Sequence, residues 1–267
     1  MQTRSPINEA RDGRSVASHA GGFSFAELLV IVSLGAILVG TILPALNTAQ
    51  DTMKAAVCLS NMHQWGLAIS LYNDDQRDYY PFDGVPGDVC NLSSNAWFNV
   101  LPPYINQPKL CDLYKANTPP TPRTRSVWTC PSATNVTVSP TQANLYFMYS
   151  ISACLHVEGM THVGFRRGQM AKPATTIIFC EEPEDNFPEA NGQYETAQRH
   201  FGGSNFVMGD SHAEWIAFGS FCRKGNGGCP PPFSNIPWDD SSAGGDWAVG
   251  VPYHWWFAKN IATLGQI

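Results

Sequence analysis

The sequence has few charged residues and none of the short motifs that carry common enzymatic chemistry. Only 14% of the 267 residues are charged. No C-x-x-C, G-x-S-x-G, H-E-x-x-H or P-loop pattern occurs, and Gly202, Gly203 and Gly209 do not form a dinucleotide-binding motif. We therefore expect that the chain is not an enzyme and needs no cofactor.

Basic residues are also scarce. The chain holds 16 Lys and Arg against 22 Asp and Glu, a formal net charge of −6. Binding to a nucleic-acid backbone depends on clustered positive charge. We therefore expect no nucleic-acid partner.

Charge is absent altogether from residues 28–46. This run of about 19 residues is long enough, at about 1.5 Å per residue, to cross a hydrocarbon core of about 30 Å as a helix. Glu27 stands at its start, where a carboxylate is costly and usually functional. In a secretory signal peptide the small residues of the cleavage site follow the apolar core. Here Gly21 and Gly22 precede it, so a cut after Gly22 would remove the leader and keep the helix.

The residues around this cut resemble a type IV prepilin N-terminus. Gly22 takes the place of the glycine at the cut, Phe23 that of the aromatic first mature residue, and Glu27 that of the glutamate at the fifth mature position. Pro44 matches a proline frequent in pilin helices. The resemblance implies cleavage after Gly22 by a prepilin peptidase, N-methylation of Phe23, and a role for Glu27 and Pro44 in assembly. A plain signal anchor is the alternative.

The helix is predicted to continue beyond the apolar run. Pro44 lacks the N–H that would bond the carbonyl of Gly40, so we expect a kink or local unwinding there and not a helix end. Apolar residues then recur mostly at steps of three or four until about Tyr72. This outer half must pack against something, because its apolar face has no lipid to contact.

These patterns predict four segments and a fold class. Residues 1–22 form a cleaved leader, 23–46 a transmembrane and assembly helix, 47–75 its outward amphipathic half, and 76–267 an exported head. Strand patterns occur at 146–151, 175–180, 205–208 and 213–218, with a tight hairpin at 209–212. We therefore expect an α+β, pilin-like fold, in which the long N-terminal helix packs on a small antiparallel sheet.

All eight cysteines follow the apolar run. An even number in an exported domain favours disulfides, and we expect at least two. Cys222 and Cys229 bracket a glycine-rich segment that they would close as a local loop, and Cys180 lies in an apolar strand, where an inert thiol or a disulfide is expected.

Two later segments resemble pilin-like proteins of planctomycetes and verrucomicrobia. Residues 58–68 match a helical segment that begins with Cys58, although His63 stands where lysine is usual. Residues 199–212 match an H-x9-D-G element through His200 and Asp210, with Ser211 in place of the glycine.

Two interpretations of His200 and Asp210 remain open. One is a divalent metal site made with His212 and either Glu181 or Glu182, with calcium as one candidate ion. The other, which we favour, is a His–Asp hydrogen bond that fixes the turn, together with bonds from Asp210 to its own backbone. The acidic run 181–185 is interpreted as a solvated loop.

The resemblance implies a structural role. We expect a subunit of a type IV pilus-like or type II secretion pseudopilus filament, with a prepilin peptidase, identical or related pilin subunits and the inner membrane as partners. It would cross the inner membrane once, with its N-terminus cytoplasmic and its head periplasmic or in a surface filament. The alternative is a membrane-tethered extracytoplasmic binding module or hydrolase that uses the pilin export route.

Overall fold

The computed structural model describes residues 24–121, 124–133, 147–152, 155, 166–170, 173–185, 187–190, 196–217, 220 and 254–255. The chain divides into two compact units, Met1–Thr48 and Ala49–Ile267. Gly22 and Phe23, where cleavage and methylation are expected, lie outside the described residues.

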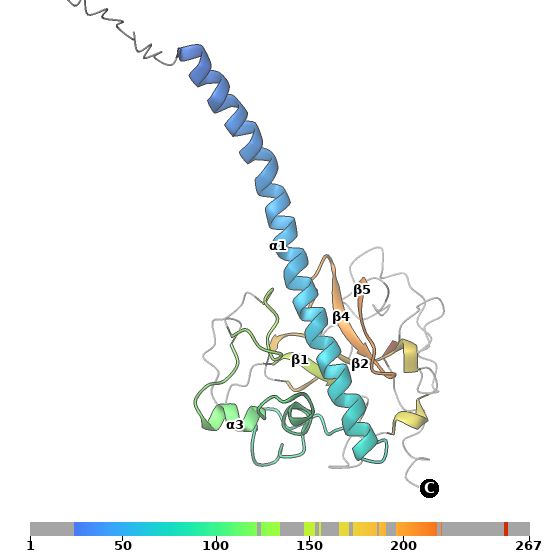
Figure 1. The fold of residues 1–267 in the computed structure, drawn as a ribbon. Coiled ribbons are helices and arrows are strands. Elements are labelled where there is room, and N and C mark those ends of the chain that lie inside the picture. Colours follow the sequence, from blue (N-terminus) through green and yellow to red (C-terminus); the bar gives the residue numbers. More distant parts are fainter. Residues whose placement is uncertain are drawn as a thin grey trace, which may run out of the picture. The chain divides into compact units, whose positions relative to one another are not determined.

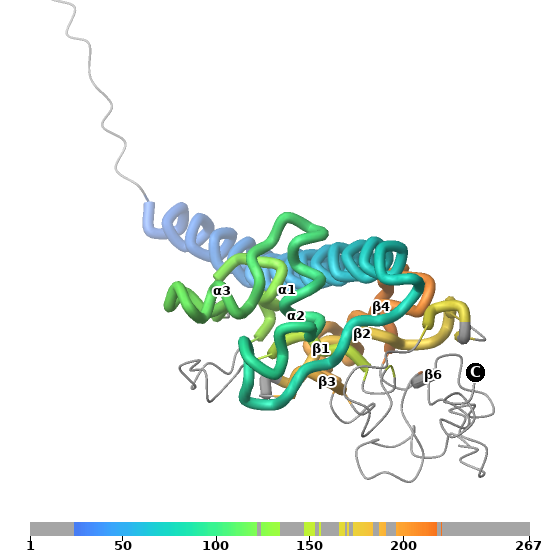
Figure 2. The backbone as a smooth tube through the Cα atoms, turned by 90° about the horizontal axis from the view of Figure 1, so that it is seen from below, coloured from blue at the N-terminus to red at the C-terminus, as the bar shows by residue number. Residues whose placement is uncertain are grey.

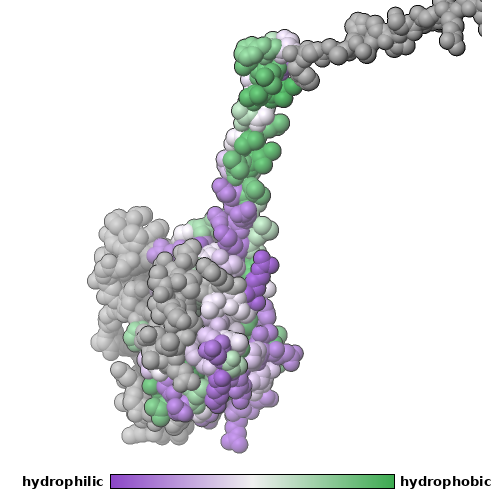
Figure 3. Space-filling view, turned by 90° about the vertical axis from the view of Figure 1, so that its left-hand side faces the viewer, coloured by the Kyte–Doolittle hydropathy of each residue, from purple (hydrophilic) through white to green (hydrophobic). Residues whose placement is uncertain are grey.

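The described part of the first unit is helical. Helix α1, Phe25–Asp75, begins in this unit and ends in the second. It is long and apolar enough to cross a membrane, a property that N-terminal signal sequences share. Between Phe25 and Leu46 its large apolar side chains are each at least half exposed. Figure 3 shows one side of the green surface that they form. A helix that is apolar all round suits lipid or a bundle of like helices.

Three side-chain hydroxyls in this part of α1 form hydrogen bonds within the helix. The hydroxyls of Ser33, Thr41 and Thr48 donate to the carbonyl groups of Leu29, Ile37 and Pro44, each four residues earlier. This internal pairing is what a low-dielectric surrounding requires. The chain is α-helical throughout 40–44, so Pro44 does not end the helix, as predicted. The helix is not unwound there, and the alternative of a kink stays a prediction.

The second unit contains a mixed β-sheet (Figure 1). Its strand order is β3-β1-β2-β4-β5, with β6 also paired to β2. Neighbours β1–β2, β2–β4 and β4–β5 are antiparallel, whereas β3 runs parallel to β1 and β6 parallel to β2. The strands are β1 Phe147–Ser152, β2 Thr176–Asp185, β3 Glu189–Ala190, β4 Gly203–Met208, β5 Ala213–Ala217 and β6 His254–Trp255.

The α+β class and the predicted hairpin between β4 and β5 are therefore confirmed. The prediction of a purely antiparallel sheet is wrong, because β3 returns beside the outer edge of β1 and β6 joins β2 in parallel. Both of these strands have two residues, too few to show an alternating pattern.

The second half of α1 packs on one face of this sheet (Figure 2). Its buried residues recur at helical spacing: Cys58, Asn61, Met62, Trp65, Gly66, Ala68, Ile69 and Asn73. The indole of Trp65 is fully buried, and its ring centroid lies 4.9 Å from that of Trp128 and 5.8 Å from that of Phe179 in β2. The amphipathic outer half therefore finds its partner in the sheet, as the periodicity predicted.

Gly66 permits the close approach of α1 to the β4–β5 turn. A Cβ atom at this position would lie 2.3 Å from the carbonyl oxygen of Ser211 and 3.2 Å from a methyl group of Val207. Any larger side chain would therefore push the helix away from the turn.

Short helices and a disulfide-linked loop cover the core beside α1. They are α2 Trp97–Val100, α3 Leu110–Lys115 and the 3₁₀ turns η1 Pro102–Ile105, η3 Arg167–Gln169 and η4 Pro173–Thr175. The Asn99 amide donates to the carbonyl groups of Val89 and Ser93, and its oxygen accepts from the Cys111 N–H. These bonds hold the two ends of the Cys90–Cys111 disulfide loop together.

Candidate functional site

Glu27 lies in the first turn of α1 and has a local hydrogen-bond partner. The carbonyl of Ser24 accepts the first helical bond, from Leu28 N–H, which makes Ser24 the N-cap residue. Glu27 Oε2 accepts a 2.8 Å hydrogen bond from the Ser24 N–H. This is half of a capping box, which satisfies a backbone donor at the helix start. Glu27 therefore caps the start of α1, and the assembly role that the resemblance implies stays a prediction.

Asp210 and His212 lie together in the β4–β5 turn. Asp210 Oδ1 accepts from the His212 backbone N–H at 3.3 Å, and lies 2.5 Å from His212 Nδ1. Ser211 between them has a φ of 71°, the left-handed conformation that glycine adopts more readily. Asp210 thus stabilises the turn through its two contacts with His212. Its histidine partner is His212 and not His200, as was expected from the sequence.

His200 lies at the opposite end of β4 from Asp210. Six residues of strand β4 separate the two sides, a span of roughly 20 Å at about 3.3 Å per residue. The structure therefore does not bring His200, Asp210 and His212 to one place.

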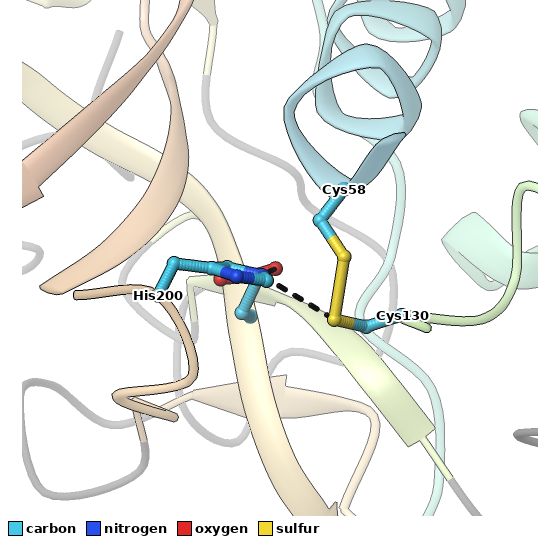
Figure 4. Close-up of side chains that lie close together, drawn as sticks. Cys58, Cys130 and His200 are labelled. Carbon is cyan, nitrogen blue, oxygen red and sulfur yellow. Dashed lines mark hydrogen bonds and ion pairs between the residues drawn. A yellow bond between two sulfur atoms is a disulfide. The ribbon is translucent and has the colours of Figure 1, made fainter. Parts of the chain in front are cut away.

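His200 is instead buried beside Glu181 and a disulfide. Its Nε2 lies 3.1 Å from Glu181 Oε1 and 3.4 Å from Cys130 Sγ, and Cys130 is bonded to Cys58 of α1 (Figure 4). The side chains of His200 and Glu181 are 1% and 0% exposed. Among the residues that the structure describes, three or more potential metal ligands converge only here, through Cys58, Cys130, Glu181 and His200.

The acidic run 181–185 is part of strand β2 and not a solvated loop. Glu181 and Glu182 are fully buried because each has polar partners in the sheet. Glu181 Oε2 accepts from the Asn205 N–H at 3.0 Å and from Ser204 Oγ at 3.3 Å. Glu182 accepts from the Ser150 hydroxyl on β1. These partners offset the cost of burying two carboxylates.

Tyr149 adds a polar group near this cluster. Burial, and then the negative charge of Glu181, raise the pKa of the Tyr149 phenol. The phenol therefore stays protonated, and its oxygen accepts a 3.2 Å hydrogen bond from the Asn61 amide of α1.

Two cysteine pairs form disulfides in the described part of the chain, Cys58–Cys130 and Cys90–Cys111. They fit the expectation of at least two. Cys180 is buried in β2, with its Sγ 3.6 Å from Ser150 Oγ. Cys154, Cys222 and Cys229 lie outside the described residues, so the loop expected between the last two stays a prediction.

Sequence reasoning named Glu181 and His200 as possible ligands but not Cys58 and Cys130. The two cysteines are separated by 72 residues, and no fixed spacing linked them to each other or to His200. Comparison of the chain with family models, with curated proteins and with solved structures found no match.

Proposed function

We propose that the chain is a structural subunit of a type IV pilus-like or type II secretion pseudopilus filament. The observation that carries this proposal is the contrast between the two parts of α1. The first part presents apolar side chains in every direction after a single carboxylate, and the second part buries its apolar face in the sheet of its own unit.

This contrast between the two parts of α1 suits a helix that packs against the same helix of neighbouring subunits. An apolar surface that is not covered within its own unit needs lipid or neighbouring helices around it. At its start lie the prepilin-like residues Gly22, Phe23 and Glu27. They favour packing against neighbouring helices once the leader has been cleaved. In this proposal the stems pack side by side, first in the membrane and then in the filament core.

The same proposal gives the chain an orientation. Disulfides form in oxidising compartments such as the periplasm, and both described disulfides lie in the second unit or tie α1 to it. We place the N-terminus in the cytoplasm, the apolar part of α1 in the inner membrane, and the second unit in the periplasm or on a surface filament. A prepilin peptidase and related pilin subunits are the partners.

The tethered-hydrolase alternative gains no support from the buried cluster. A general base must reach the proton that it abstracts from a bound substrate. His200 and Glu181 are buried and contact each other, so they do not offer an accessible acid–base pair.

Processing tests the proposal. Mass spectrometry of the chain from native membranes is expected to find an N-terminal peptide that begins at Phe23 and carries one added methyl group. Gly22→Leu is expected to abolish the cut, since a bulky side chain replaces the small residue there, whereas Gly21→Ala serves as the matched control and is cut normally. The proposal fails if the intact chain is the only species, or if the cut lies after residue 46 as in a signal peptide.

A further inference from the structure

The buried cluster of Cys58, Cys130, Glu181 and His200 contains more ionisable groups than a disulfide needs. A disulfide is neutral and packs well among apolar side chains. Here it is accompanied by a carboxylate and an imidazole, both buried and 3.1 Å from each other, so two sulfur atoms, one nitrogen and one oxygen meet at a single buried point. The four residues come from α1, from the segment before β1, from β2 and from the segment before β4.

We propose that these four residues bind one zinc ion when the two cysteines are reduced, and that the Cys58–Cys130 disulfide is the metal-free, oxidised form of the same site. The four ligand atoms all lie within 4.8 Å of one another. Tetrahedral zinc with bonds of about 2.0–2.3 Å keeps its ligand atoms roughly 3.3–3.8 Å apart. His200 Nε2 already lies 3.1 Å from Glu181 Oε1 and 3.4 Å from Cys130 Sγ, close to this range. The two sulfur atoms, which are bonded in the structure, have to separate. The Cα atoms of the two cysteines are 5.4 Å apart, so both sulfur atoms stay within reach of one ion when the bond between them is broken.

The ligand types select the ion. Two thiolates with an imidazole favour zinc, whereas calcium and magnesium prefer sites made of oxygen atoms. The two positive charges of zinc offset two of the three negative charges of the Cys58 and Cys130 thiolates and the Glu181 carboxylate, and the Asn205 N–H and Ser204 hydroxyl stabilise the carboxylate. Calcium, considered from the sequence, does not fit this set.

The surroundings of Glu181 orient it for this role. Its Oε2 is held by the Asn205 N–H and by the hydroxyl of Ser204. Its Oε1 faces His200 Nε2, within the cluster. Bonds of this kind to the outer oxygen of a carboxylate ligand are typical of metal sites and fix the direction of the inner oxygen.

The zinc form converts to the disulfide form by a balanced reaction. Zinc binding converts each thiol to a thiolate and releases one proton from each. On oxidation the two thiolates give two electrons to a disulfide-bearing oxidant, such as an exported thiol oxidase. The oxidant takes up two protons and becomes a dithiol, the Sγ–Sγ bond forms, and zinc leaves. A newly made chain already carries thiols, so the zinc form needs no reductant.

Either form links α1 to the sheet at the same point. Zinc therefore holds α1 on the sheet before the chain is oxidised, and the disulfide replaces it afterwards. This inference does not depend on filament assembly and stands or falls separately from the proposed function.

The test measures zinc in the full chain, purified in detergent with a phosphine reductant and passed through a desalting column. Elemental mass spectrometry is expected to find about one zinc per chain in the reduced protein and at least tenfold less after oxidation with a disulfide oxidant. Cobalt added to the reduced, zinc-free chain is expected to give the visible spectrum of a tetrahedral thiolate site.

Variants place the ion. His200→Ala and Glu181→Gln are each expected to weaken zinc binding at least about 100-fold, more than the loss of an outer partner does. The double variant Cys90→Ser, Cys111→Ser and the turn variant His212→Ala are matched controls that keep the zinc. Absence of zinc and of the cobalt spectrum from the reduced wild-type chain overturns the proposal, and that measurement needs no variant to fold. Zinc that survives His200→Ala but is lost from a control variant overturns it as well.

Discussion

Glu27→Ala is expected to insert into the membrane at least as well as the wild type and to be absent from filaments. Cleavage after Gly22 would free a positively charged amine on Phe23, at the start of the apolar run. An unpaired charge costs up to about 2.5–3.5 kcal/mol on insertion scales, the value for the centre of a membrane helix, and less toward its end, where Glu27 lies. Pairing between Glu27 and the amine of a neighbouring subunit would offset this cost and fix the stagger between stems, because only one register brings the two charges together.

The hydrogen bond from Ser24 N–H to Glu27 makes a sharper control available. Glu27→Gln keeps an oxygen for this capping bond but removes the charge, and glutamine is the other residue found at this place in a capping box. If capping is the whole role of Glu27, Glu27→Gln assembles normally. If charge pairing sets the register, Glu27→Gln fails like Glu27→Ala, and Glu27→Asp retains partial assembly because its charge reaches less far.

The assay is co-expression of each variant with a tagged wild-type chain, followed by shearing and immunodetection of the filament fraction. Membrane fractions from the same cells report insertion and so separate a failure to assemble from a failure to insert. Normal incorporation of both Glu27→Ala and Glu27→Gln would remove the register role and favour the tethered-module alternative.

Trp65→Ala is expected to cost the second unit about 3–5 kcal/mol of its free energy of unfolding. The indole is fully buried at the contact between α1 and the sheet, 5.4 Å from the Trp97 ring and 4.9 Å from the Trp128 ring, measured between centroids. Its Nε1 also donates a 3.1 Å hydrogen bond to the carbonyl of Val127. Truncation leaves a cavity and an unpaired acceptor. The free energy of unfolding of a domain is about 5–15 kcal/mol. The Trp65→Ala variant is therefore expected to lose a large part of the stability of the second unit.

Leu67→Ala is the matched control on the same helix. The Leu67 side chain is 53% exposed, so its removal is expected to change stability by no more than about 0.5 kcal/mol. Urea unfolding of the full chain in detergent, followed by near-ultraviolet circular dichroism, compares the two variants. Equal midpoints for Trp65→Ala and the wild type would show that α1 does not pack on the sheet through this residue.

Local patterns were enough to predict the parts of the fold that repeat along the chain. The three-to-four spacing from Leu46 to Tyr72 predicted the burial of Met62, Trp65 and Ile69. Earlier members of the same pattern, Leu46, Met53 and Val57, are exposed, so the buried face begins only at Cys58. Alternation and a glycine–aspartate turn predicted the β4–β5 hairpin. In each case the signal lies within one or two neighbouring elements, where side-chain periodicity follows directly from backbone geometry.

Features that depend on distant partners were not predicted. The charge of Glu181 and Glu182 predicts a solvated loop, but Ser204, Asn205 and Ser150 supply hydrogen bonds from other strands and both residues are buried in β2. His200 was assigned to Asp210 by sequence spacing, whereas strand β4 carries the two residues to opposite ends of the sheet. Long-range pairing of this kind leaves no periodic trace in the sequence.

The measurement that tests the filament role most directly is the composition of filaments sheared from native cells. Density-gradient fractions containing filaments, identified by electron microscopy, are expected to contain this chain, with immunogold label from antibodies against the second unit along their length. In a strain that carries only Glu27→Gln, the label is expected to disappear from filaments and to remain in the membrane. A wild-type chain found only in membranes, with no label on filaments, would contradict the account.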